Sequence, residues 1–366
     1  MKILIIITGL DLGGAEIQVS QLADHLVDYG NEVEIISMMG DVNIKPENNK
    51  IKIHNLNISK NFISIISSLK KSKKIIKNFN PDIVHSHLFH GNIFSRILKI
   101  LSPRIKLINT EHSKYIGSKS RKILYKYTKF IPDHCTNVSN EALDNFNAQN
   151  VFLKKKTSCI YNGIDTKKFQ FSDTKRIEIR KKYNIAEDIK LILAVGRLAK
   201  PKDYINLINA ISINNTTDKV HLWIIGDGSE LSNIKKKIQE LKVEDKVSLL
   251  GKKNNIPDFM SACDLFVSSS AWEGFGLVIA EAMSCERLIV ATDSGGVKEV
   301  LSHYGFIVPI KNSTELSKKI SYVLNLDDKT ADEIRKQGRK HVIRNFSFSV
   351  VINNWLELYK KITNHN

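Results

Sequence analysis

Short runs of apolar residues alternate with amphipathic stretches along most of the 366-residue chain. The run from Lys2 to Thr8 predicts a buried strand, and apolar positions three and four apart from Ala15 to Tyr29 predict a helix. Further strands are expected at residues 32–37, 51–56, 82–87, 105–110, 134–138, 191–195, 220–225, 246–250, 264–268 and 288–292. Strands that alternate with helices predict an α/β protein with parallel sheets covered by helices on both faces.

A turn at Tyr161–Asp165 and a basic stretch after it separate two rounds of this pattern. A chain of 366 residues is long for a single hydrophobic core. We therefore expect one Rossmann-like domain over residues 1–165, a second over residues 166–345, and a last helix over residues 346–366. Parallel sheets of this kind bind ligands at the carboxyl ends of their strands.

Two carboxylates, Glu273 and Glu281, flank a turn and the start of an apolar helix. Gly274 and Gly276 allow the backbone to turn sharply into a helix that begins near Leu277, whose free amides would face an anion. An ionised Glu281 among apolar neighbours needs hydrogen-bond partners, and a vicinal diol such as a ribose would supply them. The alternative is a capping glutamate followed by an exposed glutamate on an amphipathic helix.

The run Glu-Gly-Phe-Gly-Leu-(x)3-Glu-Ala-Met at residues 273–283 closely resembles the E-x7-E motif of retaining GT-B glycosyltransferases of family 4. Other motifs of this family precede that run, in the family's order and over nearly the whole chain: Gly13-Gly14, His112, Gly196-Arg197 with Lys202, and Gly226-Asp227-Gly228. The resemblance implies the GT-B fold, with two Rossmann-like domains facing a cleft and a last helix that crosses back to the first domain. The first domain would bind the acceptor and the second the nucleotide-sugar.

Two cations, Arg197 and Lys202, leave the carboxyl end of the second domain's first expected strand. A guanidinium fork and a compact ammonium group suit a diphosphate, so we expect both to converge on one ligand rather than to be ordinary surface charges. No D-x-D sequence occurs in the chain, so a bridging metal is not indicated, and no metal or other cofactor is expected.

The resemblance also implies roles for single residues. Glu273 would orient the donor hexose, Glu281 would hold the ribose, and His112 would contact the sugar. The expected catalytic residues are Glu273, His112, Arg197 and Lys202. The expected donor-binding residues are Arg197, Lys202, Gly228, Glu273, Gly274, Phe275, Gly276, Leu277 and Glu281. Gly13, Gly14 and Glu16 would line the acceptor side of the cleft.

The first half offers two other candidate chemistries. Gly13-Gly14 is not a G-x-G-x-x-G motif, which disfavours a nicotinamide dinucleotide. His85, His87 and His90 invite a metal-site interpretation, but no further ligands can be identified from their spacing. Histidines that line the core or the cleft are therefore the favoured interpretation.

Lysine and arginine number 55 against 38 acidic residues, which gives a net charge of +17. Residues 48–81, Lys60 among them, and residues 113–132 are basic and contain no acid. Each stretch is either a solvated helix face or a surface that docks onto anionic phospholipid. Nucleic acid is disfavoured because no reader motif occurs and the basic runs are not interleaved with stacking aromatics.

The four cysteines form no C-x-x-C pair, and no run reaches the roughly 18 apolar residues of a membrane span. We therefore expect a cytoplasmic protein, peripheral on the inner face of the cytoplasmic membrane. The resemblance implies retaining transfer of a hexose-type sugar, from UDP above other nucleotides, to a polyprenyl-diphosphate-linked saccharide in O-antigen or capsule assembly. Because the chain has no D-x-D sequence, we expect this reaction to be metal-independent. The alternatives are a transferase acting on the lipid A core of lipopolysaccharide, a nucleotide-sugar 2-epimerase of the same fold, and a catalytically silent nucleotide-sugar-binding or nucleic-acid-binding protein.

Overall fold

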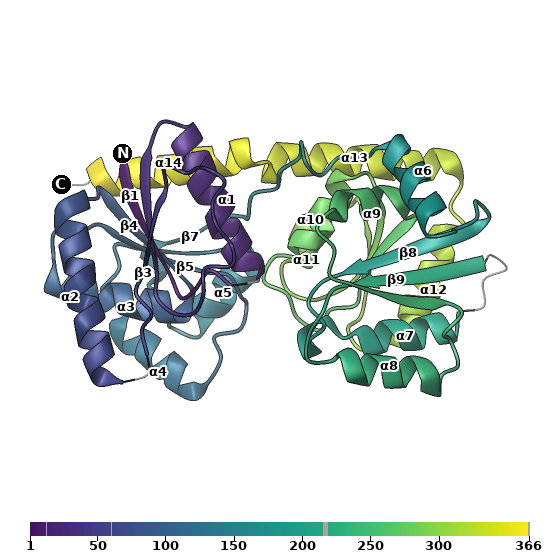
Figure 1. Ribbon diagram of the computed structural model, residues 1–366, viewed down its shortest axis with the longest axis horizontal. Coiled ribbons are helices and arrows are strands. Elements are labelled where there is room, and N and C mark those ends of the chain that lie inside the picture. The colour runs from purple at the N-terminus through teal and green to yellow at the C-terminus, as the bar shows by residue number, and fades with distance from the viewer. Residues whose placement is uncertain (12, 60, 215–218, 365–366) are drawn as a thin grey trace. The chain divides into compact units, whose positions relative to one another are not determined.

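Two parallel sheets, each covered by helices, make up the computed structural model (Figure 1), which describes residues 1–11, 13–59, 61–214 and 219–364. One unit contains Met1–Gly163 together with Phe348–Asn366, and the other contains Ile164–Ser347. The chain thus passes between units two residues before the first expected boundary and two residues after the second. The expected GT-B arrangement of two Rossmann-like α/β domains is confirmed.

The first unit holds a seven-stranded sheet in the order β3-β2-β1-β4-β5-β6-β7, with all neighbours parallel. Its strands are β1 (Lys2–Ile7), β2 (Glu32–Ser37), β3 (Lys52–Asn55), β4 (Ile83–His87), β5 (Leu107–Glu111), β6 (His134–Asn137) and β7 (Thr157–Cys159). Its helices are α1 (Gly14–Asp28), α2 (Phe62–Phe79), α3 (Leu88–Leu101), α4 (Lys119–Thr128), α5 (Asn140–Ala148), the short η1 (Lys154–Lys156) and α14 (Phe348–Asn364).

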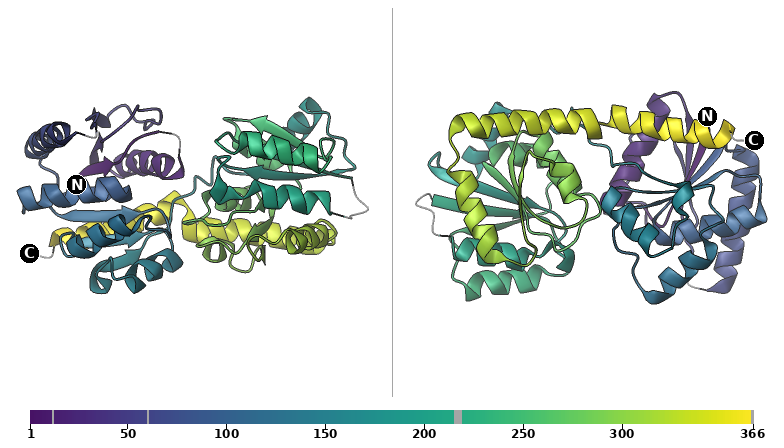
Figure 2. Two further views of the ribbon diagram at one scale, coloured as in Figure 1. Left: turned by 90° about the horizontal axis from the view of Figure 1, so that it is seen from below. Right: turned by 180° about the vertical axis from the view of Figure 1, so that it is seen from behind.

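Strand β1 shows why its sequence is continuously apolar. Ile3, Ile5 and Ile7 pack in one hydrophobic core with residues of α1 and α14, whereas Leu4 and Ile6 pack in another with residues of α2 and α3. Successive side chains of a strand point to opposite faces, so a strand covered on both faces needs an apolar residue at every position. The helices lie on either side of the sheet in Figure 2.

Helix α14 returns the end of the chain to the first unit. Its buried residues recur three and four positions apart, as expected of a helix with one buried face: Phe348, Val351, Ile352, Trp355, Leu358, Tyr359 and Ile362. They belong to the same core as α1 and β1. This helix is therefore an integral part of the first unit's core.

The second unit holds a six-stranded parallel sheet in the order β10-β9-β8-β11-β12-β13. Its strands are β8 (Ile189–Val195), β9 (Lys219–Ile225), β10 (Val247–Gly251), β11 (Leu265–Ser268), β12 (Leu288–Thr292) and β13 (Phe306–Val308). Its helices are α6 (Asp173–Lys182), η2 (Lys200–Lys202), α7 (Tyr204–Ser212), α8 (Leu231–Glu240), α9 (Ile256–Ala262), α10 (Leu277–Ser284), α11 (Val297–Leu301), α12 (Ser313–Leu324) and α13 (Asp328–Phe346).

Both sheets contain a point where the strand order reverses direction, between β1 and β4 in the first unit and between β8 and β11 in the second. Loops that leave neighbouring strands on either side of such a point diverge and open a crevice for a ligand. The expected site residues after β8 and β11 thus lie at the switch point of their sheet. In the described part of the chain, no helix is both long and apolar enough to cross a membrane.

Candidate active site

The turn before α10 has the conformation that its glycines suggested. Gly276 has a φ of 94° and directly precedes the helix, which begins at Leu277 as predicted. Gly295, with a φ of 70°, packs so closely that an added Cβ would lie 2.1 Å from the backbone oxygen of Glu273. The loop after β12 therefore holds the turn in place through a contact that only glycine permits.

Glu273 is fixed by side chains from two directions. Its Oε1 accepts a hydrogen bond of 2.7 Å from the Ser270 hydroxyl and forms an ion pair with the Lys202 ammonium group. The Glu273 side chain is 14% exposed and that of Lys202 is 22% exposed, so water only partly screens this pair. Lys202 and Glu273 are 71 residues apart in sequence, yet they form one charged unit at the sheet edge.

Backbone contacts hold the two loops that carry this pair together. The Ser269 hydroxyl donates to the backbone oxygen of Lys202 at 2.9 Å, and the Ala271 amide donates to the backbone oxygen of Pro201 at 2.8 Å. The Thr292 hydroxyl donates to the backbone oxygen of Ser270 at 2.5 Å. The position of Lys202 is therefore set by neighbouring strands and not by its own loop alone.

Gly228, expected to bind the donor, packs against protein backbone. An added Cβ on Gly228 would lie 2.3 Å from the backbone oxygen of Leu198, and one on Gly226 would lie 1.9 Å from that of Gly196. Both glycines of Gly226-Asp227-Gly228 thus let the loop after β9 lie against the loop after β8. This packing accounts for the two glycines without a ligand, so contact of Gly228 with the donor remains a proposal.

Arg197 and Lys202 differ in their surroundings. The Arg197 side chain is exposed and, among the described residues, makes no hydrogen bond or ion pair, whereas the Lys202 side chain is paired with Glu273. Both lie in the segment that follows β8, as predicted. Their expected convergence on one ligand remains a proposal, because Arg197 approaches no partner that would fix its direction.

Glu281 lies in the second turn of α10 and has an unusual environment for a carboxylate. Burial raises its pKa from the usual 4.5 to about 7, against the opposing effects of Lys168 and Lys202. Its side chain makes no hydrogen bond or ion pair within the ranges that the structure describes. A partly exposed carboxylate without a partner is available to a ligand that can donate hydrogen bonds.

Lys168 is a neighbour of Glu281 that sequence reasoning missed. The segment that carries it is held to α10 and α13, because the Ser284 hydroxyl donates to the backbone oxygen of Phe169 at 2.5 Å. Arg339 of α13 donates to the same oxygen at 3.0 Å and to that of Thr166 at 3.1 Å. No local motif marks Lys168, since these contacts span more than a hundred residues of sequence.

In the first unit, Gly13, Gly14 and Glu16 lie at the start of α1, after β1. Gly13 is the N-cap residue and Gly14 is the first helical residue. The Glu16 carboxylate folds over Gly13, where an added Cβ would lie 2.2 Å from Glu16 Oε2. These residues lie at the first sheet's switch point, and their role with an acceptor stays a prediction.

The histidines of the first unit form a buried cluster beside β4 and β5. His112 Nε2 lies 3.0 Å from His87 Nδ1, and His85 lies within 2.7 Å of both the Tyr359 and Thr110 hydroxyls. Burial lowers the pKa of His85 to about 3 and that of His112 to about 4. His90 is not part of the cluster, and no group of three or more potential metal ligands exists among the described residues.

Comparison with known proteins agrees with this architecture. The model for Glycosyltransferase Family 4 matches residues 12–168, and the model for Glycosyl transferases group 1 matches residues 175–341. Two similar proteins are the N-acetyl-alpha-D-glucosaminyl L-malate synthase of Bacillus anthracis and the N-acetylgalactosamine-N,N'-diacetylbacillosaminyl-diphospho-undecaprenol 4-alpha-N-acetylgalactosaminyltransferase of Campylobacter jejuni. Their sequences are 24% and 28% identical to this chain, respectively, and each match covers 90% of this chain and 91% of the relative.

The crystal structure of a glycosyltransferase from Rickettsia africae superposes with a TM-score of 0.87 at 24% identity, covering 100% of this chain and 99% of that one. At this identity the structure supports the fold, whereas the two family models together span most of both units. The chain belongs to the GT-B glycosyltransferases of family 4, whose two models match its first and second units in turn.

Proposed function

We propose that this protein is a retaining glycosyltransferase that moves a hexose-type sugar from a nucleotide-diphosphate-sugar to a lipid-linked saccharide. The observation that carries the proposal is the Lys202–Glu273 pair, which lies beside the start of α10 at the switch point of the second sheet. Glu281 in the same helix adds a carboxylate that lacks a partner among the described residues. A cation and helix amides suit the diphosphate of a nucleoside diphosphate, and a carboxylate that accepts hydrogen bonds suits its ribose.

The diphosphate would be bound by charge and backbone amides together. When a nucleotide-sugar reacts, negative charge grows on the leaving diphosphate, and donors already in place stabilise it without moving. Lys202 is held by Glu273 and by the Ser269 contact to its backbone, while Arg197 is free to reorient toward an arriving ligand. The amides at the start of α10 would add the positive end of the helix.

Glu281 would receive the ribose hydroxyls. Because its pKa is about 7 before any ligand binds, two donated hydrogen bonds would favour the ionised form and compensate for its burial. Glu273 would orient the hexose, with Ser270 and Lys202 fixing the direction of its carboxylate. UDP is our first choice of nucleotide and GDP fits the same contacts. We propose that no metal takes part.

The acceptor proposal draws on the relatives. The Campylobacter jejuni protein is named for a diphospho-undecaprenol-linked acceptor, which supports a polyprenyl-diphosphate-linked saccharide for this chain. The Bacillus anthracis protein is named for a product containing L-malate. Relatives of similar identity thus act on different acceptors. We follow the undecaprenol-linked one, and therefore propose an O-antigen or capsule acceptor first and a lipid A core acceptor second.

We propose that the first unit docks onto the cytoplasmic side of an anionic membrane, and exposed apolar and basic side chains of residues 113–132 support the docking. Tyr115, Ile123, Tyr127 and Phe130 are each between 57% and 72% exposed. They lie in the same stretch as Lys114, Lys119, Arg121, Lys122, Lys126 and Lys129, and residues 113–132 contain no acidic residue. The expectation that aromatic residues are not interleaved with this basic run is therefore wrong, because Tyr115, Tyr127 and Phe130 are exposed beside lysines. Exposed aromatic rings among lysines suit the interface of an anionic bilayer. Lys60 of the other basic stretch lies outside the described residues.

An activity assay would test the proposed function directly. The purified protein is incubated with UDP-sugars and GDP-sugars, with and without lipid-linked saccharide acceptors, and the products are separated. Acceptor-dependent release of nucleoside diphosphate supports the transferase. Conversion of the nucleotide-sugar to an isomer without any acceptor would instead identify an epimerase and overturn the proposal.

A further inference from the structure

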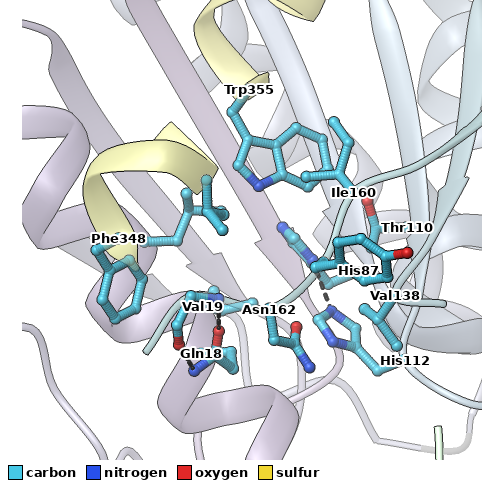
Figure 3. Close-up of a pocket in the computed structure, with 14 residues that line it drawn as sticks. Gln18, Val19, His87, Thr110, His112, Val138, Ile160, Asn162, Phe348 and Trp355 are labelled. Carbon is cyan, nitrogen blue, oxygen red and sulfur yellow. Dashed lines mark hydrogen bonds between the residues drawn. The ribbon is translucent and has the colours of Figure 1, made fainter. Parts of the chain in front are cut away.

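The His87–His112 pair lies in a small pocket of the first unit. His87 is the last residue of β4 and His112 directly follows β5, so both belong to the carboxyl edge of the sheet. Their facing nitrogens, His87 Nδ1 and His112 Nε2, are 3.0 Å apart. Both residues line the pocket together with Gln18 and Asn162 on one side and Trp355 on the other (Figure 3).

Both rings of this pair are neutral at physiological pH. Burial lowers the pKa of His112 to about 4 and that of His87 well below its ordinary value. A neutral imidazole carries one proton, so one ring nitrogen donates and the other accepts. The hydrogen bond between His87 and His112 therefore fixes the two tautomers relative to each other.

Only two proton arrangements satisfy this hydrogen bond. If His87 Nδ1 donates, His112 Nε2 accepts and both rings carry their proton on Nδ1. If His112 Nε2 donates, His87 Nδ1 accepts and both rings carry their proton on Nε2. The tautomers must match in either case, and the two remaining nitrogens always have opposite roles.

Those two remaining nitrogens have no partner among the residues that the structure describes. His87 Nε2 and His112 Nδ1 are both buried and make no hydrogen bond within the described part of the chain. Buried polar atoms of this kind are normally satisfied by protein, water or a ligand. The adjacent His85 differs, because each of its ring nitrogens has a hydroxyl within 2.7 Å.

The lining of the pocket indicates the chemistry of its ligand. The described residues around it include no Asp, Glu, Lys or Arg, so the pocket offers no charge to an anion. Both histidines line it, each with one buried ring nitrogen that has no partner among the described residues, beside apolar groups such as Trp355 and Val351. A sugar combines hydroxyls, which both donate and accept, with apolar C–H faces.

We propose that His87 is a positioning residue: its hydrogen bond fixes which nitrogen of His112 carries the proton, and so whether His112 donates to or accepts from the sugar hydroxyl that the family resemblance assigns to it. This inference rests on the proposed glycosyltransferase function and assigns a role to a residue outside the family motifs. The sugar is either that of the donor or that of the acceptor. His85 packs against His87, with ring centroids 4.0 Å apart, and so helps to hold the positioning ring.

The tautomers can be measured without any activity assay. In the full-length protein labelled with 15N-histidine, long-range proton–nitrogen correlation spectra distinguish Nδ1–H, Nε2–H and charged rings, and single variants assign the signals. We expect His87 and His112 to be neutral at pH 7 and to show the same tautomer. Different tautomers on the two rings, or a charged ring, would overturn the inference.

Ligand addition tells the two sources apart. UDP, UDP-glucose, UDP-N-acetylglucosamine, UDP-galactose and the corresponding methyl glycosides are added in turn. A shift of the His112 nitrogen signals with a UDP-sugar but not with UDP identifies the donor sugar, whereas a shift with a methyl glycoside identifies the acceptor. No shift with any of these sugars, while the melting temperature still rises with UDP-sugars, would contradict the pocket and leave the proposed function standing.

Kinetics of matched variants test the positioning role. His87→Phe keeps an aromatic ring but removes both nitrogens. We expect a loss of kcat/KM of about 10- to 100-fold, by analogy with the loss seen when the residue that orients a metal-binding histidine is removed. His87→Asn keeps a hydrogen-bonding amide near the Nδ1 position and should recover most of that loss. His90→Phe is the control, because His90 is exposed and makes no hydrogen bond to the pair among the described residues.

The outcomes separate clearly. Equal losses in His87→Phe and His87→Asn, with the His112 tautomer unchanged, would contradict the inference because hydrogen bonding would then be irrelevant. If His87→Phe fails to fold, the tautomer measurement on the unaltered protein still decides the question. If the tautomers of His87 and His112 match but no nucleotide-sugar is turned over or bound, the proposed function is wrong, whereas the hydrogen bond between the two neutral rings is still confirmed.

Discussion

Ser270 Oγ lies 2.7 Å from Glu273 Oε1, the same carboxylate oxygen that pairs with Lys202. One oxygen thus receives both a hydroxyl and an ammonium donor, while the other oxygen of Glu273 makes no hydrogen bond or ion pair with any residue that the structure describes. The serine belongs to the loop after β11 and the lysine to the segment after β8, two adjacent strands of the sheet. The fold itself therefore preorganises the carboxylate proposed to orient the sugar.

Lys202→Ala should lower kcat/KM for glycosyl transfer by about 10²- to 10³-fold, because it removes a fixed positive charge from the leaving diphosphate. Lys200→Ala is the matched control, since Lys200 lies in the same short helix, is exposed and makes no ion pair among the described residues. Steady-state kinetics with the nucleotide-sugar compare the two. If both substitutions lowered kcat/KM equally, the assignment of Lys202 to the diphosphate site would be wrong.

Nucleotide-sugar affinity should depend on the ionisation of Glu281. With a pKa of about 7, its carboxylate is mostly protonated at pH 6 and mostly ionised at pH 8, so binding should strengthen by about tenfold over this range. A nucleotide-sugar is the suitable probe because its diphosphate, esterified at both ends, does not titrate there. Isothermal titration of Glu281→Gln should show a flat profile, and a slope equal to that of the unaltered protein would exclude this role.

The same carboxyl should make stability depend on pH with a definite sign. Its folded-state pKa, about 7, is raised above the usual 4.5, so between these values the folded protein binds more protons than the unfolded chain. Its contribution is therefore most favourable below pH 4.5 and is lost as pH rises through 7. Melting temperatures of the unaltered protein and Glu281→Gln should diverge in favour of the variant as pH rises from 5 to 8.

Asp264 should be important for the stability of the second unit. Its carboxylate pairs with Arg176 at 2.6 Å and Arg180 at 3.3 Å, and accepts a hydrogen bond from the Leu191 amide at 2.7 Å. Asp264→Ala leaves two partly buried cations unpaired and should cost about 3–5 kcal/mol of unfolding free energy. Asp188→Ala, which breaks the solvent-exposed pair with Lys219, should change the unfolding free energy far less, because water screens that pair. Urea unfolding would measure the difference.

Membrane docking should require both charge and exposed rings. Tyr127→Ser with Phe130→Ser should reduce pelleting with anionic liposomes several-fold, because the variant loses apolar surface that would enter the interface. Tyr29→Ser is a control at another exposed tyrosine, on the C-cap of α1. Equal binding of the unaltered protein to neutral and anionic vesicles at low salt would argue against the proposal.

The repeated α/β pattern could be predicted from the sequence because β strands buried on both faces, such as Lys2–Ile7, are apolar at nearly every position. The helix start at Leu277 was legible for a local reason as well, since Gly276 adopts a φ that few other residues tolerate. The short strand β13 and the five-residue helix α11 had no counterpart in the prediction. A strand of three residues and a helix of little more than one turn carry too few positions to show a period.

The site was predictable only where its residues form local motifs. Glu273 and Glu281 are marked by the glycines between them, and Lys202 by its place after a strand. Ser270 and Lys168 were missed because their importance comes from contacts made by the folded chain. The run Ser268-Ser269-Ser270 at a strand end was the one signal that pointed to Ser270, since hydroxyls there face the ligand edge of the sheet.

The most direct test of the proposed function is a thermal shift of the purified protein against UDP-sugars and GDP-sugars. A ligand that binds only the folded state raises the melting temperature by mass action. We predict a rise with at least one nucleotide-sugar, reduced in Lys202→Ala and in Glu281→Ala. If no nucleotide-sugar shifts the melting temperature of the unaltered protein, or if both variants retain the full shift, the proposed donor site is contradicted.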